Sequence, residues 1–249
     1  MKVVSAAHGA LRPDAPVFRA DDEALLRGAA AFETLRVYDG RPFLLAEHLE
    51  RFRWSVEALA LPSATGVEAL VEQVAGGDGV LRLYRTSHDL VVTFAPLPPD
   101  LEEQRARGLR LRSFDVGTPT MLPGVKATSY AAAFAARREA ERAGDDDALF
   151  VSGGHVLECA TANIWWRRGD DLFTPETRAG VLPGVTRGFV LAHERVTEGA
   201  FPLDDLLTAD EAFTTSSIRE VMPVVGVDGR ELPQGPAAAR IQAAIRSAA

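Results

Sequence analysis

The sequence predicts an α+β protein of two domains. Short segments that alternate between apolar and polar residues, as half-buried strands do, are interspersed with segments whose apolar residues recur at helical spacing. A stretch rich in Gly, Pro and Thr interrupts them near the middle of the 249 residues, a length that allows one large domain or two small ones. We therefore expect an N-terminal domain over residues 1–114, a linker over 115–124 and a C-terminal domain over 125–249.

In the first domain, residues 32–38 alternate like a strand, and Asp39-Gly40 is a strong hairpin signal before the chain returns at 42–45. Apolar residues at helical spacing predict a helix over 46–61. The same reasoning predicts a helix at 67–74, strands at 80–84 and 90–94, a helix at 101–107 and a strand at 109–114.

The second domain is expected to begin with an Ala-rich amphipathic helix over 129–142, with Gly144 as its C-cap. Gly153-Gly154 predicts a hairpin turn between strands at 148–152 and 155–158. The remaining expected elements are strands at 162–166 and 172–174, a helix from 184 towards 197, strands at 211–214 and 221–225, and a last helix over 236–247.

The composition excludes several classes of protein. A hydrophobic content of 47%, a charged content of 25% and a mean hydropathy near zero are typical of soluble globular proteins. A net charge of −8 without a basic stripe argues against nucleic-acid binding. The single Cys159 excludes an internal disulfide and fits a reducing compartment. The N-terminus lacks the apolar region of a signal peptide, and no apolar run is long enough to span a membrane. We therefore expect a cytoplasmic protein.

The five histidines show no metal-ligand spacing, so no metal site is expected.

Lysine is rare in this chain. Only Lys2 and Lys126 occur among 27 basic residues, and Lys2 lies at the N-terminus. The guanidinium of arginine stays protonated, whereas a lysine amine can lose its proton and condense with a carbonyl. An interior lysine in a chain that otherwise uses arginine favours Schiff-base chemistry. The alternative is that Lys126 merely survived arginine-rich codon usage.

A pyridoxal-phosphate site needs an amine, a carboxylate for the pyridine nitrogen, a phosphate cradle and a donor to the ring hydroxyl. Lys126 offers the amine, and residues after it offer the other three. Tyr130 follows by one helical turn, and Glu158 ends a short apolar strand. Gly184-Val185-Thr186 begins a helix, whose free N–H groups favour a phosphate, and residues 214–217 offer four hydroxyls. Each feature also has a structural interpretation: a core tyrosine, an ion-paired glutamate, an ordinary helix start and a solvated turn.

Their order along the chain is more specific. Over roughly residues 20–230 the sequence resembles the class IV aminotransferases, the fold-type IV pyridoxal-phosphate enzymes that include D-amino-acid and branched-chain aminotransferases and aminodeoxychorismate lyase. The segments that carry the resemblance are Arg27-Gly28, Phe32-Glu33-Thr34-Leu35-Arg36, Glu47-His48-Leu49-Glu50-Arg51, Lys126-Ala127-Thr128-Ser129-Tyr130, Glu158-Cys159-Ala160-Thr161-Ala162-Asn163, Leu182-Pro183-Gly184-Val185-Thr186-Arg187 and Ser216-Ser217-Ile218-Arg219-Glu220-Val221-Met222-Pro223-Val224.

The resemblance implies roles for the cofactor-binding residues. Lys126 would carry the internal aldimine and move the proton between the substrate α-carbon and the cofactor, and Glu158 would bind the pyridine nitrogen. Tyr130 would touch the ring hydroxyl. The phosphate would be held by Arg51, Val185, Thr186, Ser216 and Ser217.

Substrate recognition follows the family less closely. Arg82 resembles the basic position that engages a substrate carboxylate, although it could equally form a surface ion pair. Phe32 and Arg36 lie where the family shapes one wall of the pocket, and the lyases share a threonine at the position of Thr34. The PRxH loop of the best-known D-amino-acid transaminases is replaced here by the short turn at 85–89, and Ala29-Ala30 stands where Asp-Gly is frequent.

Two activities remain open. One is a transaminase that exchanges an amino group between an amino acid, D-amino acids included, and a 2-oxo acid, which we prefer as the broader class. The other is 4-amino-4-deoxychorismate lyase, which forms 4-aminobenzoate and pyruvate, and one protein could perform both. A binding protein that lost catalysis is disfavoured because Lys126 and Glu158 are both present. By resemblance we expect a homodimer in which the turn at 85–89 contributes to the site of the neighbouring subunit.

Overall fold

The computed structural model describes residues 1–117 and 124–249, which form two compact units. The first unit comprises Met1–Pro98, Val125–Tyr130 and Ala249, and the second comprises Pro99–Gly124 and Ala131–Ala248. Both contain helices and a sheet, which confirms the α+β class. Within the described residues, no helix is both long and apolar enough to cross a membrane.

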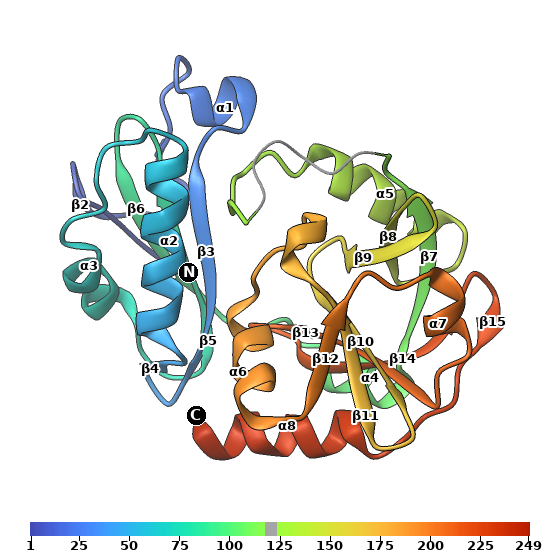
Figure 1. Cartoon of the computed structure of the whole chain (residues 1–249). Helices are drawn as coiled ribbons and strands as arrows, with labels where there is room; N and C mark the ends of the chain where they lie inside the picture. Colours follow the sequence, from blue (N-terminus) through green and yellow to red (C-terminus); the bar gives the residue numbers. More distant parts are fainter. Residues whose placement is uncertain (118–123) are drawn as a thin grey trace. The chain divides into compact units, whose positions relative to one another are not determined.

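The first unit is an antiparallel sheet covered by two helices (Figure 1). The strand order is β2-β1-β6-β5-β3-β4. The strands are β1 (Lys2–Ser5), β2 (Gly9–Leu11), β3 (Ala31–Tyr38), β4 (Arg41–Pro42), β5 (Gly79–Arg85) and β6 (Leu90–Ala95), and the helices are α1 (Glu23–Arg27), α2 (Leu45–Ala58) and α3 (Val67–Val74). Leu35 of β3 and Leu81 of β5 pack with Phe52 of α2 and Val71 of α3 in one apolar core. Because strand residues alternate, their neighbours in sequence face away from the helices.

The second unit is built on a mixed sheet in the order β12-β11-β10-β13-β14-β7-β8-β9, with β15 paired to β14. The strands are β7 (Leu109–Asp115), β8 (Asp147–Ser152), β9 (His155–Cys159), β10 (Asn163–Arg168), β11 (Asp171–Pro175), β12 (Val196–Gly199), β13 (Glu211–Ser216), β14 (Glu220–Val227) and β15 (Arg230–Glu231). The helices are α4 (Leu101–Arg107), α5 (Ala131–Arg142), the 3-10 turn η1 (Thr177–Ala179), α6 (Val185–His193), α7 (Leu203–Leu207) and α8 (Ala237–Ala248). Helix α8 packs against β14, and α6 packs against β13.

The compact units divide the chain differently from the predicted boundaries. Residues 99–114 belong to the second unit, because β7 pairs with β14 and β8 in its sheet. The segment Val125–Tyr130, which carries Lys126, belongs to the first unit. Of the predicted linker 115–124, residues 118–123 lie outside the described residues.

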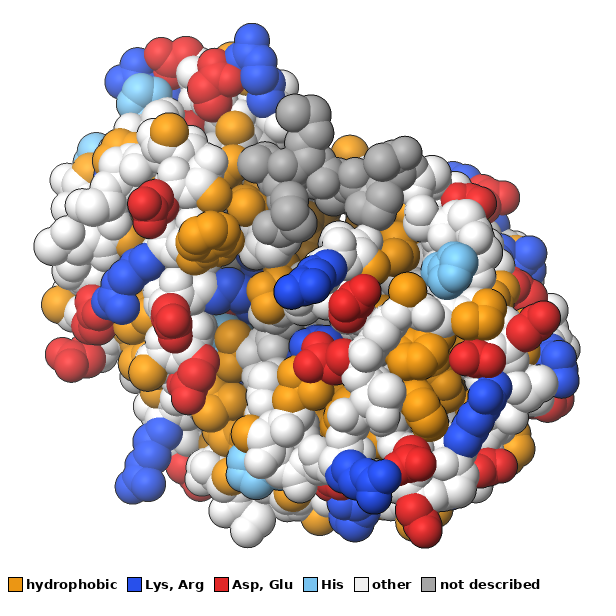
Figure 2. Space-filling view, viewed as in Figure 1, with side chains coloured by type: hydrophobic (Ala, Val, Ile, Leu, Met, Phe, Trp, Pro, Cys, Tyr) orange, Lys and Arg blue, Asp and Glu red, His pale blue; other side chains and the backbone are white. Residues whose placement is uncertain are grey.

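Most predicted elements are present, with three differences. The helix expected from 184 towards 197 ends at His193, and β12 follows it as a parallel partner of β11. Helix α5 begins at Ala131 rather than 129. The elements β1, β2, α1, η1, α7 and β15 were not predicted. On the face seen in Figure 2, acidic and basic side chains are intermixed rather than gathered into a patch of one sign.

Candidate active site

Lys126 lies on a short segment that runs beside the beginning of β3. The N–H of Phe32 donates to the carbonyl of Lys126 (3.0 Å), and the N–H of Lys126 donates to Ser55 Oγ of α2 (3.0 Å). The N–H of Thr128 donates to the carbonyl of Ala30 (2.9 Å). Gly28 permits this approach, because a Cβ there would lie 2.7 Å from the backbone of Ser129. The backbone of the lysine is therefore held from two elements of its own unit.

Two aromatic rings surround the Lys126 amine. Nζ donates a hydrogen bond to Tyr130 Oη (3.2 Å) and lies 4.5 Å from the centroid of the Phe32 ring. The Phe32 and Tyr130 rings meet edge to face at 5.4 Å. The predicted proximity of Lys126 and Tyr130 is present, but the segment between them is not helical, so the helical-turn argument for it was wrong.

Arg51 is oriented by a carboxylate that sequence reasoning assigned no role. Glu33 of β3 is fully buried and accepts hydrogen bonds from Arg51 Nε (2.7 Å) and Nη2 (2.9 Å) and from His48 Nδ1 (2.7 Å). Burial disfavours the charged carboxylate, but attraction to Arg51 and hydrogen bonds from His48 and Arg51 outweigh it and lower the pKa of Glu33 to about 2. Burial also lowers the pKa of His48, which favours a neutral imidazole at pH 7 that donates through Nδ1.

The four predicted substrate-binding residues share one face of the first sheet. The strand register sets Thr34 opposite Arg82, and Phe32 and Arg36 lie two residues to either side of Thr34. Leu35 and Leu81, one residue away from Thr34 and Arg82, face the core instead.

Tyr84 belongs to the same face and was missed. The register sets it opposite Phe32, and the two rings stack at 6.3 Å. The Phe18 ring meets the Tyr84 ring edge to face at 6.2 Å. Burial raises the pKa of Tyr84, so its phenol stays neutral at pH 7. The aromatic run Phe18, Tyr84, Phe32 and Tyr130 therefore leads to the Lys126 amine. Its sequence signal was the alternation of β5, which places Tyr84 on the side of Arg82.

In the second unit, the carboxylate of Glu158 is held by two donors. Glu158 Oε2 accepts hydrogen bonds from Asn163 Nδ2 (3.1 Å) and from the N–H of Leu182 (3.2 Å), and Asn163 Nδ2 also donates to the Leu182 carbonyl (3.0 Å). A Cβ on Gly184 would lie 2.1 Å from Asn163 Oδ1. Glycine at 184 therefore leaves space for the amide that orients Glu158.

The beginning of α6 lies beside the end of β13. Gly184, the N-cap of α6, meets Asn163, and Asn163 of β10 pairs with Thr215 of β13. The first N–H groups of any helix, here in the turn that includes Val185 and Thr186, have no intrahelical acceptor, and Gly184 has no side chain to cap them. Such a helix start favours an anion.

Only half of the predicted hydroxyl run lies at the turn. Thr214 and Thr215 are buried strand residues, and Thr215 Oγ1 accepts a hydrogen bond from Trp165 Nε1 (2.9 Å). Ser216 ends β13 and Ser217 begins the turn. The strand predicted at 211–214 therefore includes Thr214 as expected and continues through Thr215 to Ser216.

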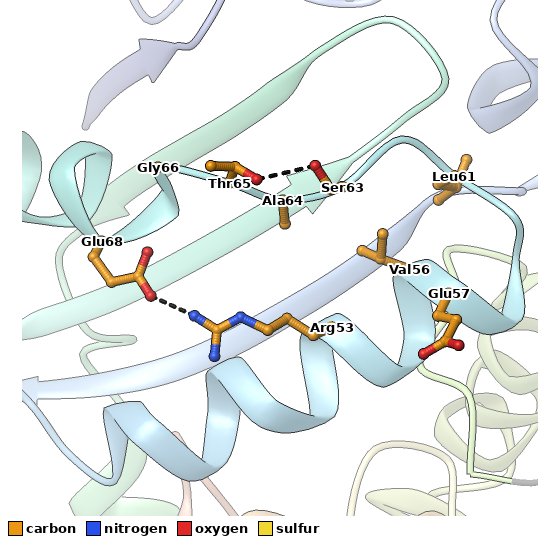
Figure 3. Close-up of a pocket in the computed structure, with 9 residues that line it drawn as sticks. All are labelled: Arg53, Val56, Glu57, Leu61, Ser63, Ala64, Thr65, Gly66 and Glu68. Atoms are coloured by element: carbon orange, nitrogen blue, oxygen red, sulfur yellow. Dashed lines mark hydrogen bonds and ion pairs between the residues drawn. The ribbon is translucent and has the colours of Figure 1, made fainter.

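A hollow of about 570 Å³ lies elsewhere in the first unit, between α2 and the segment that leads to α3 (Figure 3). Four of its polar side chains pair with one another: Arg53 bonds Glu68, and the hydroxyls of Ser63 and Thr65 lie 3.0 Å apart. None of the predicted site residues lines it. Among the described residues, no group of three or more His, Cys, Asp or Glu side chains could hold a metal ion.

Comparisons with known proteins show what the whole chain is similar to. The bifunctional aminodeoxychorismate lyase / D-amino acid transaminase of Mycobacterium tuberculosis is 29% identical over 265 residues, covering 92% of each chain. The aminodeoxychorismate lyase of Bacillus subtilis is 28% identical and covers 83% of this chain and 80% of its own. The structure of a hypothetical aminotransferase from Mycobacterium tuberculosis in its PLP-bound form superposes with a TM-score of 0.90 at 28% identity, covering 99% of this chain and 98% of the other.

The family match covers most of the chain. The sequence profile described as amino-transferase class IV matches residues 30–227, a range that includes every predicted cofactor-binding and substrate-binding residue. The solved structures that this chain resembles share the fold-type IV architecture. The chain belongs to the class IV aminotransferase family.

Proposed function

We propose that the protein is a pyridoxal 5'-phosphate-dependent transaminase that exchanges an amino group between an amino acid and a 2-oxo acid. One observation carries the proposal: the only interior lysine has its amine beside a phenol and an aromatic ring, in a chain of the class IV aminotransferase family. A lysine needed only for surface charge would have no reason to occupy such a place.

The residues present fit the cofactor. Lys126 offers the amine and Glu158 a carboxylate whose direction is fixed by Asn163 and Leu182. Gly184 makes room for the Asn163 amide that orients Glu158, and it begins α6, a helix start that favours an anion. When bound, pyridoxal 5'-phosphate supplies an electron sink for the α-carbon of an amino acid.

The protein residues then bind, orient and move protons. Lys126 Nζ takes the proton from the substrate α-carbon and returns it to the acceptor carbon, and Tyr130 Oη, 3.2 Å away, orients the amine. Glu158 would bind the pyridine nitrogen. The phosphate would be held by Arg51, Val185, Thr186, Ser216 and Ser217. The bidentate contact with Glu33 restricts the Arg51 guanidinium to one orientation before any ligand arrives.

The substrate is proposed to lie against the face of β3 and β5. Arg82 would bind its carboxylate, since a guanidinium forms a planar double contact with a carboxylate. Phe32, Thr34 and Arg36 would line the wall, and Tyr84 adds an aromatic surface beside Phe32. An aromatic wall is compatible with apolar amino acids and with the ring of aminodeoxychorismate.

The second candidate activity is aminodeoxychorismate lyase. It is favoured by the relative that performs both reactions and covers 92% of this chain, and by the aromatic run that ends at Lys126. Both reactions need the same proton removal by Lys126.

A paired assay separates the two activities. The purified protein would be offered D-alanine or L-leucine, each with 2-oxoglutarate, and aminodeoxychorismate alone in parallel. Bleaching of the cofactor absorbance by an amino acid and its recovery with the 2-oxo acid would support the transaminase and identify the hand of its substrate. Release of 4-aminobenzoate without amino transfer would replace the transaminase with the lyase. Lys126→Arg protein is the control that should do neither.

We also propose a homodimer in the cytoplasm. The exposed apolar side chains Phe18, Leu25 and Leu26 near α1 support a partner surface, and the turn at 85–89 remains the proposed contributor to the neighbouring site. Its conformation is fixed by Asp89, which accepts hydrogen bonds from Ser5 Oγ and from the N–H of Ala7. Sedimentation analysis that finds a fully active monomer would contradict the dimer.

A further inference from the structure

The turn that joins β13 to β14 ends at a residue with an unusual backbone conformation. Glu220, the first residue of β14, pairs with Ser216 and has a φ of +57°. This left-handed conformation is common for glycine and asparagine but costs energy for other side chains. Glu220 is also 1% exposed. A strained, buried glutamate persists only when its surroundings fix it, and such positions cluster at functional sites.

Two helices distant in sequence hold its carboxylate. Glu220 Oε2 accepts hydrogen bonds from Arg105 Nη2 of α4 (3.1 Å) and from Arg246 Nη2 of α8 (3.0 Å). Gln242 of α8 donates to the same oxygen, while its own Oε1 accepts the N–H of Val221 (3.0 Å). The carboxylates around Arg246, that of Glu220 foremost, raise the pKa of its guanidinium.

The same groups fix the backbone of the turn. Arg105 donates to the carbonyl of Arg219 through Nη2 (2.8 Å) and to that of Val221 through Nε (3.0 Å), on either side of Glu220. The Arg219 side chain pairs with the buried Asp147 of β8 at 2.9 Å. Residues 219–221 are thus tied to α4, α8 and β8, while Ser216 and Ser217 form the other side of the turn.

We propose that Glu220 is a positioning residue for cofactor phosphate: its contacts with α4 and α8 hold the Ser216–Ser217 side of the β13–β14 turn in the conformation that binds the phosphate. The inference rests on the proposed function, since it assigns a device to the same phosphate site. It explains why a glutamate occupies a position suited to glycine: its carboxylate accepts from three donors on α4 and α8, which glycine could not do.

Glu211 provides a matched control. It is equally buried, lies at the opposite end of β13, and accepts the N–H groups of Ala237 (3.0 Å) and Ala238 (2.7 Å) at the start of α8. Glu211→Ala therefore removes a buried carboxylate that also contacts α8, from the neighbouring strand β13, without touching the turn.

The experiment compares apo-proteins in binding pyridoxal 5'-phosphate and pyridoxal, which has the aldehyde but no phosphate. Glu220→Ala is expected to raise the Kd for pyridoxal 5'-phosphate at least tenfold and that for pyridoxal less than threefold, and Glu220→Gln is expected to recover part of the loss. Glu211→Ala should lower the apo-protein Tm but keep the ratio of the two Kd values within threefold of wild type.

The decisive quantity is the Kd for pyridoxal 5'-phosphate divided by the Kd for pyridoxal. The inference would be overturned if this ratio were equal in Glu220→Ala and Glu211→Ala, or if it were unchanged from wild type in Glu220→Ala. If Glu220→Ala does not fold, Arg246→Gln removes one half-exposed donor to Glu220 and should still raise the ratio; an unchanged ratio would also overturn the inference. Wild-type protein that binds pyridoxal 5'-phosphate no better than pyridoxal would overturn the phosphate assignment and the inference with it. Wild-type protein that binds neither aldehyde would overturn the proposed function itself.

Discussion

Glu33→Gln tests the buried cluster that orients Arg51. The carboxylate has no exposed surface, and its pKa of about 2 lies well below its ordinary value of 4.5. A difference of roughly 2.5 pKa units corresponds to about 3 kcal/mol of stability at pH 7. Removing one partner of a buried ion pair gives a similar range, about 3–5 kcal/mol. We therefore expect Glu33→Gln to lower the free energy of unfolding by about 3 kcal/mol.

The sign of the pH dependence follows from the direction of the shift. The folded-state pKa is depressed, so the contribution of Glu33 is complete above pH 4.5 and is lost as the pH falls towards 2. His48 also titrates in acid, so the acid comparison is best made between His48→Gln and the double variant His48→Gln/Glu33→Gln. The difference in their free energies of unfolding at pH 3 should be less than half of the difference at pH 7.

Urea unfolding followed by circular dichroism measures both the free energy of unfolding at pH 7 and its change with pH. Asp21 supplies the matched control, because its pKa is also lowered to about 2, by a hydrogen bond from Arg19, yet the pair is fully solvated. Asp21→Asn should change stability little, since solvent screens exposed pairs. A Glu33→Gln protein within about 1 kcal/mol of wild type, or an equal loss in Asp21→Asn, would refute the reasoning.

Three further variants test the site. Lys126→Arg should lose the visible absorbance of bound cofactor and all turnover, because a guanidinium stays protonated; near-normal activity would exclude the proposed role of the lysine. Gly184→Ala places a Cβ 2.1 Å from Asn163 Oδ1, so Asn163 must shift and Glu158 loses a donor. We expect about tenfold weaker cofactor binding by spectroscopic titration. Unchanged binding would contradict the proposal that Asn163 orients Glu158 for the cofactor. Tyr130→Phe keeps the ring contact but removes the hydroxyl 3.2 Å from Nζ, so kcat should fall about 10–100-fold at constant Tm; an equal fall in Tm would indicate a structural role instead.

The sequence was most informative where the signal is local. The alternation of β3 and the Asp39-Gly40 turn predicted the hairpin, and apolar spacing predicted α2 nearly to its ends. The strand β12 was read as the end of α6, because four residues carry no clear period and its pairing with β11 is parallel and non-local. The strand β7 was predicted as a strand, but it belongs to the second compact unit, because its partners β8 and β14 are distant in sequence.

The candidate site divides in the same way. Lys126, Glu158 and the start of α6 carry residue types whose chemistry can be read from the sequence. Glu33 could have been noticed as a carboxylate at an inward strand position between apolar neighbours, but its partners on α2 become visible only in the fold. The donors to Glu220 come from residues more than a hundred positions apart, and no local pattern predicts them.

The most direct test of the proposed function is to reduce the protein with borohydride in the presence of pyridoxal 5'-phosphate and to map the modified peptide by mass spectrometry. Only Lys2 and Lys126 can carry the label on a side-chain amine. The proposal predicts one stoichiometric label, on the peptide that contains Lys126. A label confined to Lys2 or the N-terminus, or no label at saturating cofactor, would contradict it.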